Sequence, residues 1–322
     1  MKHLVQVVQV GPIHPHPHAD TLGITTIDGY TVVVKRDQWE PGDPGVYIEP
    51  DYVVPDVPWA AMLNGKRRIR VKRLRGVVSQ GLLLKLSDVG LPADTAPGTN
   101  VMETLGITRY EPPADPLGAE DAPAPAFLPT LAPYDLESWR KHKHLFQPDE
   151  PVVVTEKLHG ESARFVWDDE TKTLHLGSRT KWKRPDAASS WAIALRMQPW
   201  IEAWCRAFPR HVLYGEVFGN VPSMAYRVPK GGRDFRVFDV WCAGAWLAWD
   251  AMAAILPVSR RVPVLYRGAH SNVTESMANG PSLLAPHVRE GFVVKPLVER
   301  DDPTIGRLVL KCVGDDYHLR GE

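Results

Sequence analysis

The sequence is divided by a proline-rich stretch at residues 111–134. Seven prolines occur there, mixed with alanine and acidic residues. Such a composition predicts an extended, semi-rigid segment with little to bury. The remaining length is sufficient for two separate cores. We therefore predict an N-terminal domain at residues 1–110, a linker at residues 111–134 and a C-terminal domain at residues 135–322.

Short β-type segments fill the N-terminal domain. Apolar and β-branched residues gather at residues 5–10, 29–34, 45–48, 68–74 and 81–84. Turn-forming pairs such as Asp28-Gly29 and Asn64-Gly65 separate these runs. About five short strands in a domain of about 100 residues predict a Greek-key barrel of the OB type. Residues 16–22 (HPHADTL) and 78–84 (VSQGLLL) also resemble the tRNA-binding OB domains attached to some synthetases.

A basic run in this domain alternates loosely with apolar residues. On a strand it would place Arg68, Arg70 and Lys72 on one cationic face. Such a face could contact phosphates of a nucleic acid, or it could be a solvated edge strand protected from aggregation by its charge. Because the chain as a whole carries no net charge, we favour the nucleic-acid surface.

Three histidines, His14, His16 and His18, alternate with prolines and could suggest a metal clip. The prolines hold the segment extended and no cysteine lies nearby to complete a site. We therefore predict a polar turn rather than a metal centre.

Composition excludes several classes of protein. Lys+Arg and Asp+Glu are equal at 38 each, which argues against a histone-like polycation. The three cysteines are widely spaced, so neither a disulfide framework nor a zinc knuckle is expected. No apolar run has the length of a signal peptide or a membrane span. The sequence thus predicts a protein of the reducing cytoplasm with no membrane segment.

The C-terminal domain begins with a buried-strand pattern that ends in a lysine. The run Val152-Val153-Val154-Thr155 is followed by Glu156, Lys157 and Gly160. β-Branched residues favour a strand, and Gly160 allows a tight turn and close backbone approach to a ligand. Lys157 could be a nucleophile if its ammonium loses its proton readily, or a strand-end lysine extended into solvent. Further along, Asp135 is expected to cap a short helix, and residues 187–208 are expected to form a helix interrupted at Pro199.

Five further clusters follow Lys157 along the chain. They contain Ser178-Arg179, Glu216, Phe238-Asp239, Glu290 with Lys295, and Lys311. Each alone also fits a structural role, as an edge-strand acid, a core aromatic or a surface lysine. Together they meet the needs of nucleotidyl transfer to a lysine: an amine, cations near a phosphate, carboxylates for a metal and an aromatic face for a base.

This order of motifs resembles the covalent nucleotidyltransferase superfamily of ATP-dependent ligases and capping enzymes. The likeness covers residues 135–316. Within the superfamily, His159 stands where DNA ligases usually carry Asp, and Phe235-Arg236-Val237-Phe238-Asp239 is similar to RNA ligases of the phage T4 second-ligase type. Only 11 residues follow Lys311, too few for the C-terminal OB domain of DNA ligases and capping enzymes. An N-terminal OB-like module joined to this core resembles the Deinococcus-type RNA ligases.

The resemblance implies an α+β fold in which an OB-like barrel is joined to an ATP-grasp-like nucleotidyltransferase domain of antiparallel sheets and helices. It implies ATP with Mg²⁺ or Mn²⁺, a lysyl-AMP intermediate on Lys157, and a monomer that seals 3′-OH/5′-phosphate nicks in duplex RNA or RNA/DNA hybrid. Lys295, Lys311 and the metal are expected to lower the pKa of Lys157. The implied nucleotide-binding residues are Glu156, Gly160, Arg179, Glu216, Phe238 and Glu290. Glu216 and Glu290 would bind metal or sugar hydroxyls, Phe238 would stack on adenine, and Arg179 would hold a phosphate or the terminal nucleotide.

Two departures from the family pattern affect the substrate contacts. Val309 occupies a position that often carries a second basic residue, and Arg307 could compensate for it. Pro222 and Ser223 stand where related ligases often carry polar residues. The alternatives are a DNA ligase, a GTP-using capping enzyme, or a non-catalytic RNA-binding protein with the same fold. Retention of Lys157 argues against the last of these, because binding alone needs no nucleophile.

Overall fold

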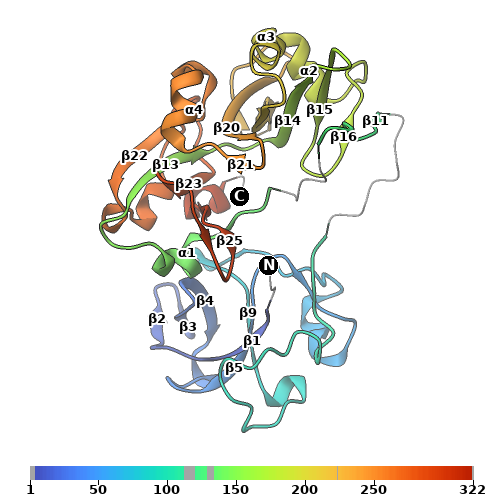
Figure 1. The fold of residues 1–322 in the computed structure, drawn as a ribbon. Helices are drawn as coiled ribbons and strands as arrows, with labels where there is room; N and C mark the ends of the chain where they lie inside the picture. Colours follow the sequence, from blue (N-terminus) through green and yellow to red (C-terminus); the bar gives the residue numbers. More distant parts are fainter. Residues whose placement is uncertain (1–3, 112–119, 129–133, 223, 321–322) are drawn as a thin grey trace. The chain divides into compact units, whose positions relative to one another are not determined.

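The computed structural model describes residues 4–111, 120–128, 134–222 and 224–320 (Figure 1). The chain divides into two compact units, residues 1–114 and 115–322. Much of the expected linker, at residues 112–119 and 129–133, lies outside the described residues, as does Ser223. In the described part of the chain, no helix is long and apolar enough to cross a membrane.

The first unit is built from small antiparallel sheets. One sheet has the order β1-β5-β9 and a second has the order β2-β3-β4. Apolar residues of the first sheet, among them Val7, Val46 and Leu84, point into a shared core. The elements are β1 (Gln6–Gln9), β2 (His14–His16), β3 (Ala19–Ile27), β4 (Tyr30–Lys35), β5 (Pro44–Ile48), β6 (Tyr52–Val53), β7 (Lys72–Leu74), β8 (Val77–Ser79), β9 (Leu82–Lys85) and β10 (Thr108–Arg109), with short 3₁₀ turns η1 (Arg36–Gln38), η2 (Pro58–Leu63) and η3 (Ser87–Val89).

The longest strand of this unit was not expected from the sequence. β3 contains three threonines, a glycine and an aspartate among its apolar residues and is exposed over its first half. The expected strand at residues 68–74 is reduced to β7, and Arg68 joins the sheet only through an isolated bridge to Val53. The histidine segment forms β2 and a turn, and buried His16 bonds the Leu74 carbonyl through Nε2 at 3.0 Å.

The second unit contains two larger sheets. A seven-stranded sheet has the order β11-β16-β15-β14-β17-β20-β21, and a five-stranded sheet has the order β12-β26-β23-β13-β22. Its strands are β11 (Asp121–Ala122), β12 (Glu137–Ser138), β13 (Pro151–Lys157), β14 (Glu161–Asp168), β15 (Thr173–Gly177), β16 (Trp182–Lys183), β17 (Val212–Phe218), β18 (Asn220–Val221), β19 (Met224–Ala225), β20 (Asp234–Cys242), β21 (Ala245–Trp246), β22 (Val264–Ala269), β23 (Gly291–Pro296), β24 (Asp301–Asp302), β25 (Gly306–Arg307) and β26 (Leu310–Val313). The helices are α1 (Trp139–His142), α2 (Ser190–Met197), α3 (Trp200–Ala207), α4 (Trp249–Ile255) and α5 (Asp315–Leu319), with 3₁₀ turns η4 (Lys143–Leu145), η5 (Val258–Arg260), η6 (His270–Asn272) and η7 (Glu275–Ala278).

The helices α2 and α3 lie against the seven-stranded sheet (Figure 1). The predicted interruption at Pro199 is confirmed, because this residue separates α2 from α3. Buried Ile201 packs with Phe165 of β14 in one core. The expected cap by Asp135 is wrong: Ser138 precedes α1, and Asp135 instead forms an ion pair with Arg179.

The described part of the linker does bury residues, contrary to the expectation from its composition. Asp121 and Ala122 form β11, which adds an edge strand to β16. The Asp121 carboxylate accepts hydrogen bonds from Lys181 and Lys183, and its side chain is only 4% exposed. Phe127 packs on a cluster centred on Val166 and Tyr214. A proline-rich composition therefore did not reveal that this segment docks on a sheet.

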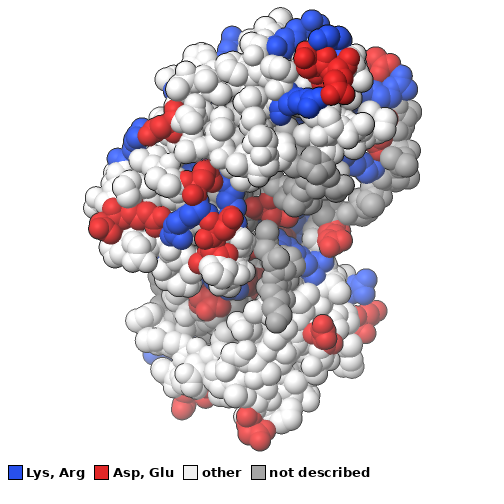
Figure 2. Space-filling model, in the orientation of Figure 1, with Lys and Arg blue, Asp and Glu red and all other residues white. Residues whose placement is uncertain are grey.

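Charged residues are distributed without strong segregation on the face shown in Figure 2, where basic and acidic side chains lie side by side. This arrangement agrees with the zero net charge of the sequence. A cationic binding surface must therefore be local.

Candidate active site

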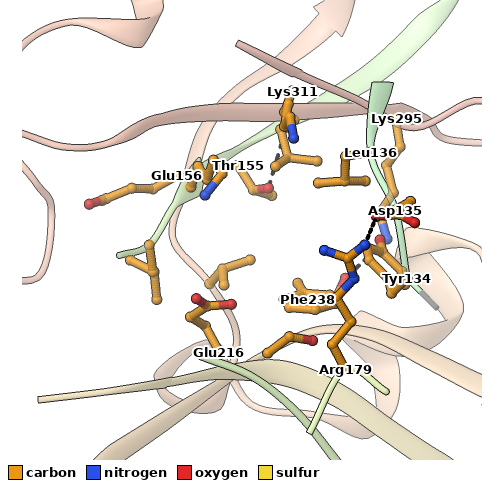
Figure 3. A pocket seen from close by; sticks show the side chains of 15 residues that line it. Tyr134, Asp135, Leu136, Thr155, Glu156, Arg179, Glu216, Phe238, Lys295 and Lys311 are labelled. Carbon is orange, nitrogen blue, oxygen red and sulfur yellow. Dashed lines mark hydrogen bonds and ion pairs between the residues drawn. The ribbon is translucent and has the colours of Figure 1, made fainter. Parts of the chain in front are cut away.

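A cavity of about 300 Å³ in the second unit is lined by residues from both sheets (Figure 3). Seven of the residues expected at the site line it: Glu156, Lys157, Arg179, Glu216, Phe238, Lys295 and Lys311. Glu216 enters from β17 of the seven-stranded sheet and Lys311 from β26 of the five-stranded sheet. The cavity is therefore formed where the two sheets face each other.

Lys157 occupies the last position of β13, opposite Gly291 of β23. Pairing of these two strands brings the lysine beside Glu290, and its Nζ lies 2.5 Å from Glu290 Oε1. Burial alone would lower the pKa of Lys157, but the carboxylates of Glu290 and Glu216 outweigh it and raise the pKa. The neighbouring lysines alone therefore do not lower this pKa, and the expected fall, which also included a bound metal, stays a prediction.

The two carboxylates beside Lys157 differ in protonation. Burial raises the pKa of Glu216 to about 8 despite the nearby lysine. Burial acts in the same direction on Glu290, but Lys157 and His159 overcome it and lower the pKa to about 2. At neutral pH one charged carboxylate thus balances one charged lysine, and Glu216 is mostly protonated.

Gly160 is required by packing between strands. An added Cβ would lie 2.2 Å from the carbonyl oxygen of Val217 and 3.0 Å from Glu216 Cγ. The Gly160 N–H also donates a hydrogen bond to Glu216. The glycine therefore lets the β13–β14 turn approach β17 and holds Glu216 at the cavity.

Lys295 lines the cavity and is paired with the buried carboxylate of Asp239. Asp239 is fully buried and accepts hydrogen bonds from Lys295 Nζ at 2.5 Å and from Arg307 at 2.9 and 3.0 Å. Tyr134 also donates its hydroxyl to this carboxylate. Burial lowers the pKa of Lys295. This geometry gives Lys295 a structural partner that the sequence did not indicate.

Phe238 is half-buried and its ring lies 4.8 Å from that of Tyr134. Tyr134, the last residue of the proline-rich stretch, lines the cavity together with Asp135 and Leu136, which follow it. No sequence motif indicated them. An aromatic residue at the end of a linker is a weak signal, and only the fold shows that it reaches the cavity.

Two expected nucleotide-binding residues have internal partners. Arg179 forms an ion pair with Asp135. The Glu156 side chain points away from Phe238 in Figure 3, and its Oε2 accepts a hydrogen bond from the Leu283 N–H at 2.8 Å. Its Oε1 is buried with no hydrogen-bond partner. The Glu156 carboxylate is therefore held by the main chain of Leu283 in this structure.

The basic run of the first unit borders a larger cavity of about 1170 Å³. Arg70 and Lys72 line this cavity and are exposed, together with Lys66 and Arg67. Arg68 differs from them. It forms an ion pair with Asp51 at 2.6 Å and stacks 3.7 Å above the Tyr110 ring, so its guanidinium is already bound by residues of the same unit.

The donor atoms around Lys157 fit a metal that is bound together with a phosphate ligand. Among the residues that the structure describes, no group of three or more His, Cys, Asp or Glu could hold a metal ion. Glu216 and Glu290 provide two carboxylates. Mg²⁺ in nucleotide sites usually takes one or two carboxylates and completes its shell with phosphate oxygens and water. The site therefore suits a metal that arrives with a nucleotide, not a preformed metal centre.

Comparison with known proteins gives independent matches for both units. The RNA ligase family model matches residues 150–313, and an OB-fold domain model matches residues 4–86. Two structures of Naegleria gruberi RNA ligase match 98% of this chain over 98% of their own length. One, with PPi, has a TM-score of 0.75 at 26% identity. The other, a mutant with ATP and Mn, has a TM-score of 0.77 at 27% identity.

Curated relatives match a shorter segment. The phenylalanine–tRNA ligase beta subunit of Neisseria gonorrhoeae is 34% identical over 98 residues, which is 30% of this chain and 12% of the relative. That of Anaeromyxobacter dehalogenans is 31% identical over 118 residues, 32% of this chain and 14% of the relative. The likeness to synthetase domains noted in the sequence thus has counterparts among known proteins, but it spans only a small part of them.

Proposed function

This chain belongs to the RNA ligase family, and from that premise we propose that it seals 3′-OH/5′-phosphate nicks with ATP and Mg²⁺ or Mn²⁺. The observation that carries this proposal is the position of Lys157 at the cavity, beside the carboxyl groups of Glu216 and Glu290, in a cavity that Phe238 also lines. The likeness to Naegleria ligase structures with ATP and Mn supports the choice of nucleotide and metal. We place the chain with the Deinococcus-type ligases because an OB-like module precedes its ligase core.

In the proposed first step, Lys157 Nζ loses a proton and attacks the α-phosphorus of ATP. An N–P bond forms, the bond to the β-phosphate oxygen breaks, and pyrophosphate leaves. The AMP then passes from Lys157 to the 5′-phosphate of the nick. Finally the 3′-OH attacks that phosphate, so that a phosphodiester bond forms and AMP is released.

The main obstacle to the first step is the proton on Lys157. In this structure Glu290 and Glu216 keep the pKa of the lysine raised. A divalent cation held by these carboxylates would supply positive charge that offsets theirs. Burial would then dominate, and burial lowers the pKa of an ammonium group. Lys311, which lines the same cavity, is placed to offset negative charge on the phosphate.

In this proposal Phe238 contacts the base of the nucleotide, and the cationic residues of the cavity contact its phosphates. The half-buried Phe238 ring offers a face for adenine, and the Tyr134 ring packs against Phe238 with 4.8 Å between the ring centroids. The Arg179 guanidinium would leave its ion pair with Asp135 and bind a phosphate instead. In the first unit, the exposed Arg70 and Lys72 would contact the nucleic-acid backbone.

The proposal is tested by labelling with ATP that carries ³²P at the α-phosphate. We expect the parent to carry covalent label that survives denaturation and alkali but is released by acid, as a lysyl phosphoramidate is, and we expect no label on Lys157→Ala. Lys230→Ala, which removes an exposed lysine, is the matched control and should label normally. Equal labelling of Lys157→Ala and parent would reject Lys157 as the nucleophile.

Substrate choice is tested with nicked duplexes that differ only in the strand that provides the 3′-OH. We expect sealing when that strand ends in RNA and little sealing when it is all DNA. GTP in place of ATP should give no label. Preferential sealing of all-DNA nicks would favour a DNA ligase, and labelling by GTP would favour a capping-type enzyme.

A further inference from the structure

The helix α5 is fixed beside the cavity by contacts at its start. Gly314, between β26 and α5, donates its N–H to the Glu290 carbonyl at 2.9 Å. A Cβ at Gly314 would lie 2.5 Å from the Ala278 carbonyl oxygen, so only glycine fits there without a shift. Asp316 donates its N–H to Asn279 Oδ1 at 3.2 Å. The backbone of α5 is thus tied to the strand that begins next to Glu290.

Tyr317 projects from α5 to His159. Its hydroxyl lies 2.9 Å from His159 Nδ1. The backbone N–H of His159 donates to the Tyr226 hydroxyl, also at 2.9 Å. The histidine is therefore held at two points, the main chain by Tyr226 and the ring by Tyr317.

His159 in turn faces the carboxylate that pairs with Lys157. Its Nδ1 lies 3.7 Å from Glu290 Oε2, while Lys157 binds Oε1 of the same group. A neighbouring carboxylate favours the imidazole tautomer with its proton on Nδ1, so this N–H lies between the Tyr317 and Glu290 oxygens. At 3.7 Å this N–H lies beyond hydrogen-bond distance of Glu290 while Tyr317 accepts it at 2.9 Å, so His159 is a nearby donor that Glu290 gains by a small movement of the ring.

This second donor matters when Lys157 turns towards a phosphorus atom. The Glu290 side chain is 12% exposed, and a buried carboxylate that loses its partner is left poorly solvated. A histidine already in place can compensate for the loss of the lysine, in addition to the cation that we propose these carboxylates hold. A histidine whose ring rotates freely would do so only part of the time.

We propose that Tyr317 is a positioning residue for adenylylation of Lys157: it holds His159 against Glu290 so that this carboxylate keeps a donor when Lys157 leaves it. The inference rests on the proposed function, because it requires Lys157 to be the nucleophile. Tyr317 itself does not line the cavity, and its hydroxyl contacts the site through the His159 ring.

The test compares Tyr317→Phe, which removes only the hydroxyl, with Tyr266→Phe. The Tyr266 hydroxyl bonds the Ala269 carbonyl at 3.2 Å, so the control loses a similar hydrogen bond away from the cavity. At saturating ATP we expect Tyr317→Phe to slow labelling of Lys157 about fivefold to tenfold, the effect of one hydrogen bond, with an unchanged KM for ATP. Tyr266→Phe should label at the parent rate. Melting temperatures establish that both variants fold.

A double-mutant cycle separates positioning from a general structural role. In a His159→Ala background, Tyr317→Phe should cause no further loss, because its partner is absent. The imidazole ¹⁵N signals of His159 should also shift in Tyr317→Phe. Additive losses in the cycle, unmoved His159 signals, or a parent-like rate would overturn the inference. Failure of the parent itself to label would instead reject the proposed function.

Discussion

Lys157 Nζ lies 2.5 Å from Glu290 Oε1, so the proposed nucleophile is paired with a carboxylate in this structure. The pairing follows from the register of β13 and β23, which sets Lys157 opposite Gly291, the residue after Glu290. The ion pair stabilises the buried ammonium group of Lys157 and thereby keeps the lysine protonated. The adenylylation that we propose therefore has to begin with a change in the charge around this pair.

Glu216 gives a prediction about stability and pH. Burial raises the pKa of Glu216 from its ordinary value of 4.5 to about 8, so the folded protein holds an extra proton between these pH values. Stability from this group is complete below pH 4.5 and is lost as pH rises towards 8. Glu216→Gln should remove this loss and be more stable than the parent at pH 8, by at least about 1 kcal/mol.

The measurement is chemical unfolding of both proteins at pH 5.5 and pH 8. Glu170→Gln is the control, since its side chain is 76% exposed. The change in the free energy of unfolding between the two pH values is compared between variant and parent, so that contributions from other titrating groups, which both proteins share, cancel. Identical pH dependence in Glu216→Gln and parent would contradict the burial of this carboxylate.

Asp239 gives a prediction about the fold. Asp239→Asn keeps the shape of the side chain but removes the charge that pairs with Lys295 and Arg307. Two cations would then share a buried site, and such a loss typically costs about 3–5 kcal/mol. Asp186→Asn breaks an exposed pair with Arg184, whose charges are screened by water, and should cost far less stability. Urea unfolding measures both, and similar small losses would show that the Asp239 network contributes little.

The chemistry of the site was more predictable than its construction. Lys157, Glu216 and Lys311 were identified because their residue types follow one another in a recognisable order. Their convergence on one cavity agrees with that reading. The direction of the Lys157 pKa was not predictable, since it depends on a 2.5 Å contact between two strands that are far apart in sequence.

Elements with weak local patterns were missed for a related reason. β3 is polar over its first half, and β11 has two residues within a proline-rich segment. Both form strands because a partner strand supplies their hydrogen bonds, and periodicity does not report such partners. Tyr134 reaches the cavity by the same docking of the linker region. By contrast, the break at Pro199 has a local cause and was predicted correctly.

The first unit gives a prediction about salt dependence. Arg70 and Lys72 are exposed on the large cavity, whereas Arg68 is bound to Asp51 and Tyr110. The double change Arg70→Gln and Lys72→Gln should weaken binding to a nicked duplex and reduce the slope of log K against log salt by about 2. Arg68→Gln should leave that slope unchanged. Fluorescence titrations at several salt concentrations test this, and a slope reduced only by Arg68→Gln would reverse the assignment.

Asp135 gives a prediction about nucleotide binding. In this structure its carboxylate occupies Arg179 at the cavity, where we propose that the guanidinium meets a phosphate. The two anions would then compete for one cation. The Arg179 side chain is 50% exposed, so the competing ion pair is worth at most about 1 kcal/mol. Asp135→Asn should therefore bind ATP up to about fivefold more tightly, and Arg179→Gln should bind it more weakly. Calorimetry with a non-hydrolysable ATP analogue measures both, and the double variant should resemble Arg179→Gln, because Asp135 acts only through that residue. An Asp135→Asn variant that binds the analogue more weakly would mean that this carboxylate holds Arg179 in its binding position and does not compete for it.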